Sequence, residues 1–304
     1  MAAMDEQETC PMRATRSRLL APLCLGVGLL AFAGGSAGNP AVPALPPPTA
    51  PATSAQPGDL GLSYAIYVGG VHVIDASAHI GPLAEMYRVG LSLQTDGLLG
   101  RIANWKTDVR AYGRLDGTGM PQPVRFTAHG AWRDEPRLTT LDYPVGGAPL
   151  LSLADPAPEK DREPVPDELR QGTLDPVSAI VAVLDRVGRG GTCDLTVPVY
   201  DGRQRYDLAF SDRGQDQVAA SDLSAFSGAA RRCAVTYKPL AGKWKENRPD
   251  RRDRDGEGAR RAGREVTLWI ASAMPGGPAV PVRLEMDSPL GPVMVHLAKL
   301  DRVG

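Results

Sequence analysis

The sequence predicts a mainly β protein: one strongly curved antiparallel sheet, an open barrel or β-spiral, packed on one principal α-helix at about residues 176–187. Glycine and proline make up about one fifth of the 304 residues, a density of turn residues that suits short strands and argues against a helical bundle. Hydrophobic and polar residues alternate over much of residues 62–143, and apolar residues recur at helical spacing after Asp175.

The composition excludes some classes of protein. Its 34 Lys and Arg residues are balanced by 35 Asp and Glu residues, which leaves a net charge of −1. A nucleic-acid-binding protein needs a basic excess to neutralise phosphates, so no nucleic acid is expected as a partner. With 42% hydrophobic and 23% charged residues, the chain is close to globular averages, so wholesale disorder is not expected.

The first 37 residues have the order of a secretory signal peptide. Arg13, Arg16 and Arg18 precede an apolar run at residues 19–33, and a small-residue stretch ends at Ala37. We therefore expect cleavage after Ala37 and a mature protein in the periplasm.

Other interpretations of this segment remain open. The apolar run could stay as an uncleaved signal anchor, and Cys24 could be lipidated, although Leu23 stands where lipidation signals need a small residue. Cleavage would remove Cys10 and Cys24 and leave two cysteines in the mature chain. It would also remove Ser36, whose GxSxG surroundings match a nucleophile elbow only formally.

The mature chain is expected to contain one folded domain over residues 58–302. Residues 38–57 before it hold seven prolines and are predicted to be a disordered Pro/Ala-rich linker. Within the domain, residues 243–264 carry nine basic and five acidic side chains, which predicts a disordered charged insertion. This insertion is either a contact for acidic lipid headgroups or an anionic polymer, or a solvated loop.

The first half of the domain has the pattern of strands. In residues 87–94, Tyr87, Val89 and Leu91 share one face, and polar residues alternate with them. Similar runs lie near residues 64–68, 71–78, 102–112, 124–132 and 138–143. Because short turns separate these runs, neighbouring strands are expected to be antiparallel. Residues 154–171 are poor in apolar residues and are predicted to be a surface loop.

The predicted helix begins after Asp175, an N-cap residue that is followed by Pro176 at the first helical position. Apolar residues then recur at helical spacing, at Val177, Ile180, Val181, Leu184 and Val187. Only this face is strongly apolar, so the helix is expected to lie against a sheet.

Strands return after the helix. The runs lie near residues 195–199, 206–210, 266–270, 280–286 and 293–300. Pro198 and Pro281 fall within two of them. Since proline cannot donate to a strand ladder, these two residues predict edge positions or bulges.

Cys193 and Cys233 are predicted to form a disulfide. Cys193 has the strand parity of Val197, and Cys233 has that of Val235, so both thiols are expected to point to the core. In an oxidising compartment, two core-facing cysteines most simply pair. Two free buried thiols are the alternative, whereas a redox-active pair would show closer spacing, such as C-x-x-C.

No catalytic residue, metal site or cofactor is predicted. The chain has four histidines, at His72, His79, His129 and His296. None has the partner spacing of a zinc site, so each is interpreted as a strand surface or rim residue. Helix capping accounts for Asp175, which could otherwise be taken as catalytic. Possible ligand-facing side chains are the aromatic residues Tyr64, Tyr87, Trp105, Phe126 and Trp269.

Four short motifs, in order, resemble a known family. They are residues 64–70 (YAIYVGG), 175–179 (DPVSA), 200–203 (YDGR) and 281–285 (PVRLE). Over roughly residues 60–302 they resemble the exported bacterial family known as domain of unknown function 3108. The resemblance implies a periplasmic β-rich protein with no assigned activity and no agreed catalytic residues. The charged insertion looks longer than expected for that family, so no role is carried over to it.

The leading hypothesis for function is a non-enzymatic periplasmic role in cell-envelope maintenance, through a ligand or a protein partner. One alternative is a lipid or lipoprotein carrier, which requires an apolar cavity inside the sheet. The other is an envelope hydrolase, which requires a cleft with converging carboxylates or an activated nucleophile. The expected partner is accordingly an envelope protein, a lipid or an anionic polymer.

Overall fold

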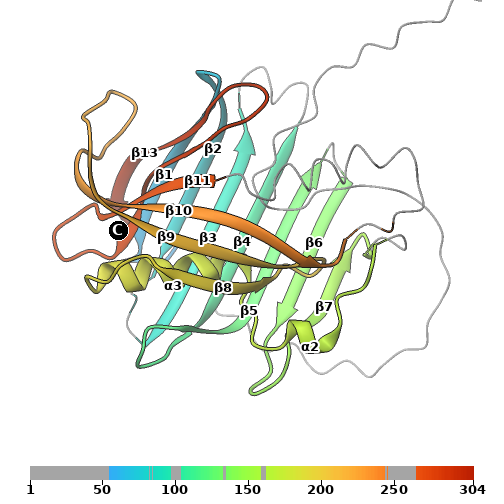
Figure 1. Ribbon diagram of the computed structural model, residues 1–304. Coiled ribbons are helices and arrows are strands. Elements are labelled where there is room, and N and C mark those ends of the chain that lie inside the picture. Colours follow the sequence, from blue (N-terminus) through green and yellow to red (C-terminus); the bar gives the residue numbers. More distant parts are fainter. Residues whose placement is uncertain are drawn as a thin grey trace, which may run out of the picture. The chain divides into compact units, whose positions relative to one another are not determined.

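In the computed structural model, one antiparallel sheet makes up most of the fold (Figure 1). The structure describes residues 55–81, 83, 85–96, 104–132, 135–158, 162–243, 245 and 265–304. The predicted signal peptide, most of the predicted linker and most of the charged insertion lie outside these residues. No helix in the described residues is long and apolar enough to cross a membrane.

The strands fall into two halves on either side of the helices. The first half contains β1 (Leu60–Val68), β2 (Val71–Ile80), β3 (Met86–Thr95), β4 (Trp105–Leu115), β5 (Pro121–Trp132), β6 (Glu135–Asp142) and β7 (Leu150–Asp155). The helices are α2 (Asp167–Arg170) and α3 (Pro176–Gly188). The second half contains β8 (Leu195–Tyr200), β9 (Arg205–Val218), β10 (Gly228–Ala241), β11 (Glu265–Ser272), β12 (Ala279–Met286) and β13 (Val293–Arg302).

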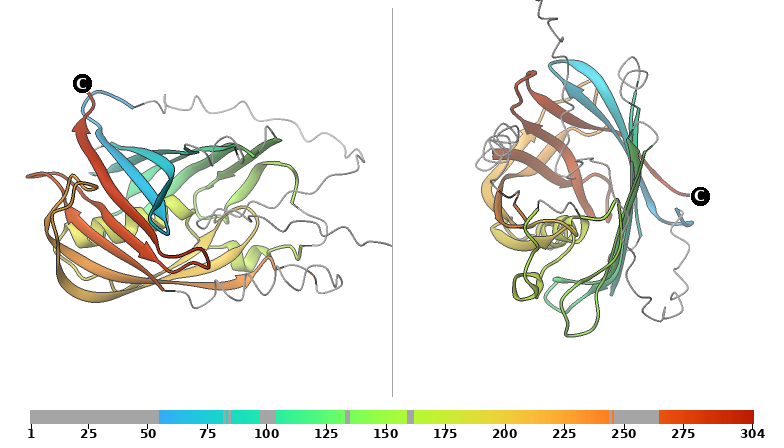
Figure 2. Two further views of the ribbon diagram at one scale, coloured as in Figure 1. Left: turned by 90° about the horizontal axis from the view of Figure 1, so that it is seen from above. Right: turned by 90° about the vertical axis from the view of Figure 1, so that its right-hand side faces the viewer.

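The two halves form one sheet of 13 strands because β1 pairs with β13. The strand order is β7-β6-β5-β4-β3-β2-β1-β13-β12-β11-β10-β9-β8, so β7 and β8 are the edges. Figure 2 shows the sheet curving round α3, with the first half on one side of the helix and the second half on the other. This arrangement confirms the predicted mainly β fold, a curved antiparallel sheet packed on one principal helix.

Polar contacts span the gap between the two sheet edges, which are not joined by strand pairing in the described residues. In the turn between β8 and β9, Arg203 donates to Thr139 Oγ1 of β6 at 3.1 Å and to the Pro156 carbonyl at 2.8 Å. Gly202, at φ +94°, allows this close approach, because a Cβ there would lie 2.9 Å from Thr139 Cγ2. The sheet is therefore an open barrel, and the hydrogen bonds of Arg203 bridge its two edge regions.

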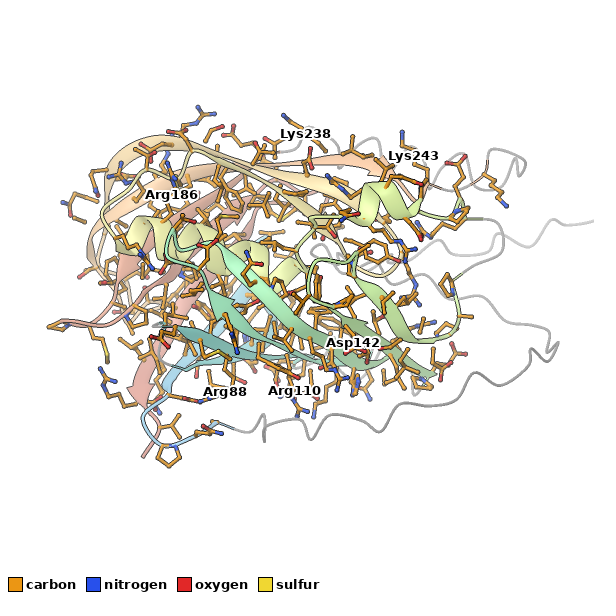
Figure 3. All side chains as sticks on the ribbon, turned by 90° about the horizontal axis from the view of Figure 1, so that it is seen from below. Arg88, Arg110, Asp142, Arg186, Lys238 and Lys243 are labelled. Carbon is orange, nitrogen blue, oxygen red and sulfur yellow. A yellow bond between two sulfur atoms is a disulfide. The ribbon has the colours of Figure 1, made fainter. Side chains whose placement is uncertain are left out.

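Helix α3 is buried on two sides. On one side, Ala182, Val183 and Leu184 join a core cluster with Cys193, Val197, Phe210, Ile270 and their neighbours. On the other side, Val181 packs with Tyr87, Val109, Phe126, Leu141 and their neighbours. Charged side chains such as Arg88, Arg110, Asp142 and Lys238 project outward from the sheet (Figure 3). The interior is therefore mainly apolar, and the helix occupies it between the two core clusters.

Two short elements differ from the sequence expectation. Strand β7 pairs with β6 at the edge of the sheet, and α2 lies within residues 154–171, which were expected to form a loop. Most side chains of β7 are exposed, including Leu150 and Leu153. Since β7 buries no regular face, it has no alternating pattern by which a strand could be recognised.

The start of α3 carries a buried polar network. Asp175 Oδ1 accepts hydrogen bonds from the backbone N–H groups of Val177 and Ser178, at 3.0 and 2.9 Å. Ser178 Oγ donates to Asp175 Oδ2 at 2.5 Å and lies 2.7 Å from the Tyr87 hydroxyl. Asp175, Ser178 and Tyr87 are each at most 1% exposed. Asp175 thus caps the helix, and Ser178 connects the cap to β3.

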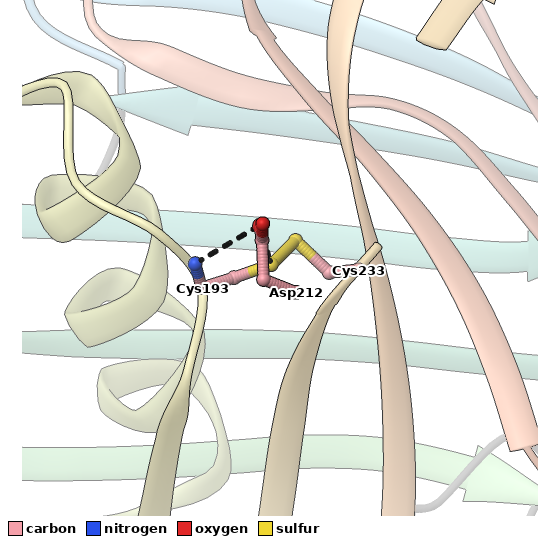
Figure 4. A group of neighbouring side chains, drawn as sticks. All are labelled: Cys193, Asp212 and Cys233. Atoms are coloured by element: carbon pink, nitrogen blue, oxygen red, sulfur yellow. Dashed lines mark hydrogen bonds between the residues drawn. A yellow bond between two sulfur atoms is a disulfide. The ribbon is translucent and has the colours of Figure 1, made fainter. Parts of the chain in front are cut away.

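The predicted disulfide between Cys193 and Cys233 is present. The two Cα atoms are 6.1 Å apart, and neither residue has exposed surface. The backbone N–H of Cys193 donates to Asp212 Oδ1 at 3.5 Å (Figure 4). The bond links the segment before β8 to β10 across the intervening strand β9, and it joins residues 40 positions apart.

Loss of this bond is expected to destabilise the fold. Replacing both cysteines (Cys193→Ala with Cys233→Ala) should lower the free energy of unfolding by about 4 kcal/mol, because the unfolded chain loses a closed loop of about 40 residues. Urea unfolding under non-reducing conditions measures the change. Wild-type protein unfolded with a thiol reductant is the matched control and should lose the same amount. An unfolding midpoint equal to that of the oxidised wild type would contradict this.

The buried cap predicts a pH dependence of stability. Burial raises the pKa of Asp175 to about 6, although hydrogen bonds from Ser178 and the backbone lower it, whereas an unfolded aspartate titrates near 3.9. Between about pH 4 and 6 the folded state binds more protons than the unfolded state. The free energy of unfolding should therefore fall as the pH rises through this window, by about 3 kcal/mol in total.

Asp175→Asn isolates this contribution, because asparagine caps a helix equally well and does not titrate. Urea unfolding between about pH 4 and 7 should show a steeper loss of stability in the wild type than in Asp175→Asn. Asp175→Ala is the control for loss of the cap, and it should be less stable than Asp175→Asn by about 1 kcal/mol at every pH. Parallel profiles for the wild type and Asp175→Asn would refute the assignment.

Candidate functional site

A pocket of about 470 Å³ opens beside strands β1, β12 and β13. The strands contribute Tyr67, Arg283, Met294 and His296, the turn after β1 contributes Gly70, and the loop between β9 and β10 contributes Ala219, Ala220, Ser221 and Leu223. We call this the His296 pocket. Its walls are mainly apolar, with four side chains that carry polar groups: the guanidinium of Arg283, the imidazole of His296, and the hydroxyls of Tyr67 and Ser221.

The loop that forms one wall of the pocket is hydrogen-bonded to the sheet. The backbone N–H of Ala225 donates to the Leu297 carbonyl of β13 at 2.7 Å. Ser224 Oγ donates to the Phe226 carbonyl at 3.0 Å, and Phe226 packs in an apolar cluster that contains Leu297. These contacts hold the loop against β13, so this wall of the pocket is fixed in the folded protein.

His296 is the most buried polar side chain in the pocket. It is 6% exposed, and no described residue makes a hydrogen bond or an ion pair with its imidazole. The ring of Tyr67 lies edge-on to it, with 5.9 Å between the ring centroids. Burial, and then the positive charge of Arg283, lower the pKa of His296. At pH 7 the ring is neutral, so one nitrogen can donate a hydrogen bond and the other can accept one.

The interpretation of His296 as a surface or rim residue was therefore wrong. Strand parity places the ring on the side of β13 opposite Leu297, which is fully buried. The loop at residues 219–223 lies over that side and covers the ring. This covering comes from residues more than seventy positions away, which a strand pattern does not reveal.

Arg283 provides the positive charge of the pocket. Its guanidinium forms an ion pair with Glu285, and the guanidinium carbon lies 5.3 Å from the centroid of the Trp269 ring. Trp269 Nε1 in turn donates to Asp216 Oδ2 at 2.9 Å. These neighbours fix the arginine in place while leaving part of its side chain exposed.

The aromatic residues singled out from the sequence lie mostly in the core. Tyr87, Trp105 and Phe126 are buried, and the Tyr64 hydroxyl donates to the Pro281 carbonyl at 3.0 Å. Trp269 is also buried and touches the pocket only through Arg283. None of the five is among the described residues that line the His296 pocket.

A second polar group lies next to the pocket. His72 Nε2 is 3.0 Å from Asp75 Oδ1, and His72 Nδ1 is 3.4 Å from Asp96 Oδ2. The ring of Tyr67 lies 5.2 Å from the His72 ring, so this side chain stands between the His72 group and the pocket. Sequence reasoning missed the group because it looked for pairs of histidines, whereas the partners of His72 are carboxylates.

Two other features of the described residues were candidates for a site. The hydroxyl–carboxylate pair Ser178 and Asp175 has no exposed surface, so no substrate can reach it. A second pocket of about 480 Å³ opens at the end of α3, where its lining includes Leu184, Asp185 and Arg189. Core clusters cover both sides of α3, so neither described pocket is an apolar cavity inside the sheet.

Comparison with solved structures finds similar chains at low sequence identity. A β-barrel-like protein of domain of unknown function DUF1849 from Brucella abortus has 12% identity and a TM-score of 0.48, covering 81% of this chain and 98% of that chain. A hypothetical protein from Chlamydia trachomatis has 10% identity and a TM-score of 0.26, covering 82% and 89%. A lipoprotein candidate from Parabacteroides distasonis has 11% identity and a TM-score of 0.25, covering 82% and 98%.

No curated protein sequence matches the chain. The profile of one family does match, over residues 63–298, and that family is described as a protein of unknown function, DUF3108. The match spans well over half of the chain and contains all four motifs that suggested the resemblance. This chain belongs to the DUF3108 family.

Proposed function

We propose that this protein is an exported, non-enzymatic protein of the periplasm that serves the cell envelope by binding a small ligand in the His296 pocket. The proposal rests on the burial of His296 and on the hydrogen-bonding capacity of its imidazole. Its side chain is 6% exposed and has no partner among the described residues, yet it lines a pocket. The imidazole nitrogens therefore remain available to hydrogen-bond a molecule that enters the pocket.

The pocket lining defines the chemistry of that partner. Leu223, Met294 and Ala220 provide apolar surface, while Arg283 and His296 provide a cation and a neutral hydrogen-bonding ring. The volume of about 470 Å³ falls within the range of small-molecule sites, roughly 300–1,000 Å³. These features favour an amphiphilic ligand with an apolar body and an anionic end.

Export is supported by two independent features. The buried disulfide between Cys193 and Cys233 is typical of proteins in oxidising compartments. The first 37 residues have the charge, length and small-residue end of a signal peptide.

Binding at the surface is favoured over the two alternatives. A lipid carrier needs an internal apolar cavity, but α3 and its two core clusters occupy the interior. A hydrolase needs an accessible nucleophile, but the hydroxyl of Ser178 is sealed in the core beside Asp175.

The export part of the proposal predicts the mature protein. When the full chain is produced in a Gram-negative host, the periplasmic fraction should contain a protein that begins at Gly38 with Cys193 and Cys233 oxidised. Intact mass spectrometry with and without thiol alkylation measures both properties. Replacing Arg13, Arg16 and Arg18 by glutamate is the control, because it removes the positive region that export requires. Recovery of a membrane-bound protein that retains residues 1–37 would contradict cleavage.

The binding part can be tested with 8-anilinonaphthalene-1-sulfonate, an amphiphilic anion that fluoresces in apolar sites. The folded wild type should bind one probe molecule saturably at pH 7, and Ala220→Trp should abolish binding because the indole fills the pocket. Ala229→Trp is the matched control, since Ala229 is exposed on the adjoining strand β10 and does not line the pocket. Equal fluorescence from both tryptophan variants would refute the assignment.

A further inference from the structure

We propose that His72, Asp75 and Asp96 bind a divalent transition-metal ion, with zinc as the first candidate. The three side chains offer one imidazole nitrogen and two carboxylate oxygens, which are common zinc ligands. The proposal concerns a different group of residues from the His296 pocket and does not depend on the proposed function.

The donor atoms are spaced like the ligands of one ion. Zinc–ligand bonds of about 2.0–2.2 Å place neighbouring ligand atoms roughly 3.0–3.5 Å apart. His72 Nε2 lies 3.0 Å from Asp75 Oδ1, and the other ring nitrogen, Nδ1, lies 3.4 Å from Asp96 Oδ2. One donor atom from each of the three residues lies within 4.8 Å of the other two. Since one ion binds only one ring nitrogen, the carboxylate on the far side of the ring must turn toward that nitrogen, and both carboxylates are half exposed.

The contact between His72 and Asp75 lacks the geometry of a hydrogen bond. His72 Nε2 is buried and has no hydrogen-bond partner among the described residues, although the Asp75 oxygen is only 3.0 Å away. A neutral imidazole nitrogen that carries a lone pair and a carboxylate oxygen at this distance can share one cation. A metal ion supplies that cation.

The charges around His72, Asp75 and Asp96 also favour a bound cation. In the described part of the chain, the only ion-pair partner of Asp75 and of Asp96 is His72 itself. Within the described residues, the two carboxylates therefore have no lysine or arginine that pairs with them. Both are 49% exposed and His72 is 32% exposed, so an ion from solvent can reach all three. Mixed imidazole and carboxylate ligands suit zinc and its neighbours in the first transition row better than calcium or magnesium.

The scaffold holds the donors in position. His72 and Asp75 lie on β2, and Asp96 directly follows β3, the neighbouring strand. The backbone N–H of Asp96 donates to the Val73 carbonyl at 3.0 Å, which fixes the end of β3 beside the two β2 donors. The ring of Tyr67 packs against His72. A site built on paired strands is preorganised, so the ligands lose little freedom when the ion binds.

Isothermal titration with zinc tests the proposal. The protein is produced by export, purified from the periplasm without an affinity tag and treated with EDTA. The wild type should bind one zinc ion per chain, and zinc should raise its melting temperature. His72→Ala and Asp75→Asn should each weaken binding by about tenfold or more. His129→Ala, which removes an exposed histidine outside the group, should bind zinc like the wild type.

A variant of the pocket and a check of folding make the outcome of the titration unambiguous. Ala220→Trp should bind zinc normally, which separates this site from the His296 pocket. If His72→Ala does not fold, as judged by circular dichroism, the nearly isosteric Asp75→Asn decides the result. Absence of saturable zinc binding would overturn the proposal, because it would show that His72 only pairs with the two carboxylates. Zinc binding that both variants retain would overturn it as well.

Discussion

The burial of α3 on two sides is the constraint on which the rest of the structure depends. Its apolar residues at helical spacing divide between the two sides, with Val177 and Val181 in one core cluster and Ile180, Leu184 and Val187 in the other. The small side chains of Ala179 and Ala182 are buried too, and they let strands approach the helix closely. One flat sheet covers only one side of a helix, so a single sheet can bury both only by curving round it. The 13 strands do this, and their two edges come close enough for Arg203 to bridge them.

This arrangement explains why the interior contains polar groups but no functional site. A helix that starts inside the core has backbone N–H groups that water cannot reach, and Asp175 satisfies two of them. The carboxylate is buried as a result, and its pKa rises. Ser178 Oγ then donates to this carboxylate and lies 2.7 Å from the Tyr87 hydroxyl. With the helix and its core clusters in the interior, the two described pockets open at the surface.

Much of the fold could be predicted because the local sequence pattern of a segment agrees with the place of that segment in the folded sheet. Pro198 lies on the edge strand β8, and Pro281 lies at a register shift between β11 and β12, as the missing N–H groups require. The candidate sites could not be predicted in this way. The pocket at His296 needs the loop at residues 219–223, and the group at His72 needs the end of the next strand. Both depend on which strands become neighbours, and a single strand pattern does not contain that information.

Tyr67 connects the two proposed sites. Its ring packs against His72 on one side and His296 on the other, with centroid distances of 5.2 and 5.9 Å, and it also lines the pocket. A cation bound by His72 fixes the imidazole against which this ring packs, and a ligand in the pocket contacts the same ring from the other side. Tyr67 lies on β1, between β2 with His72 and β13 with His296, so the pairing of these three strands brings the two groups to one ring.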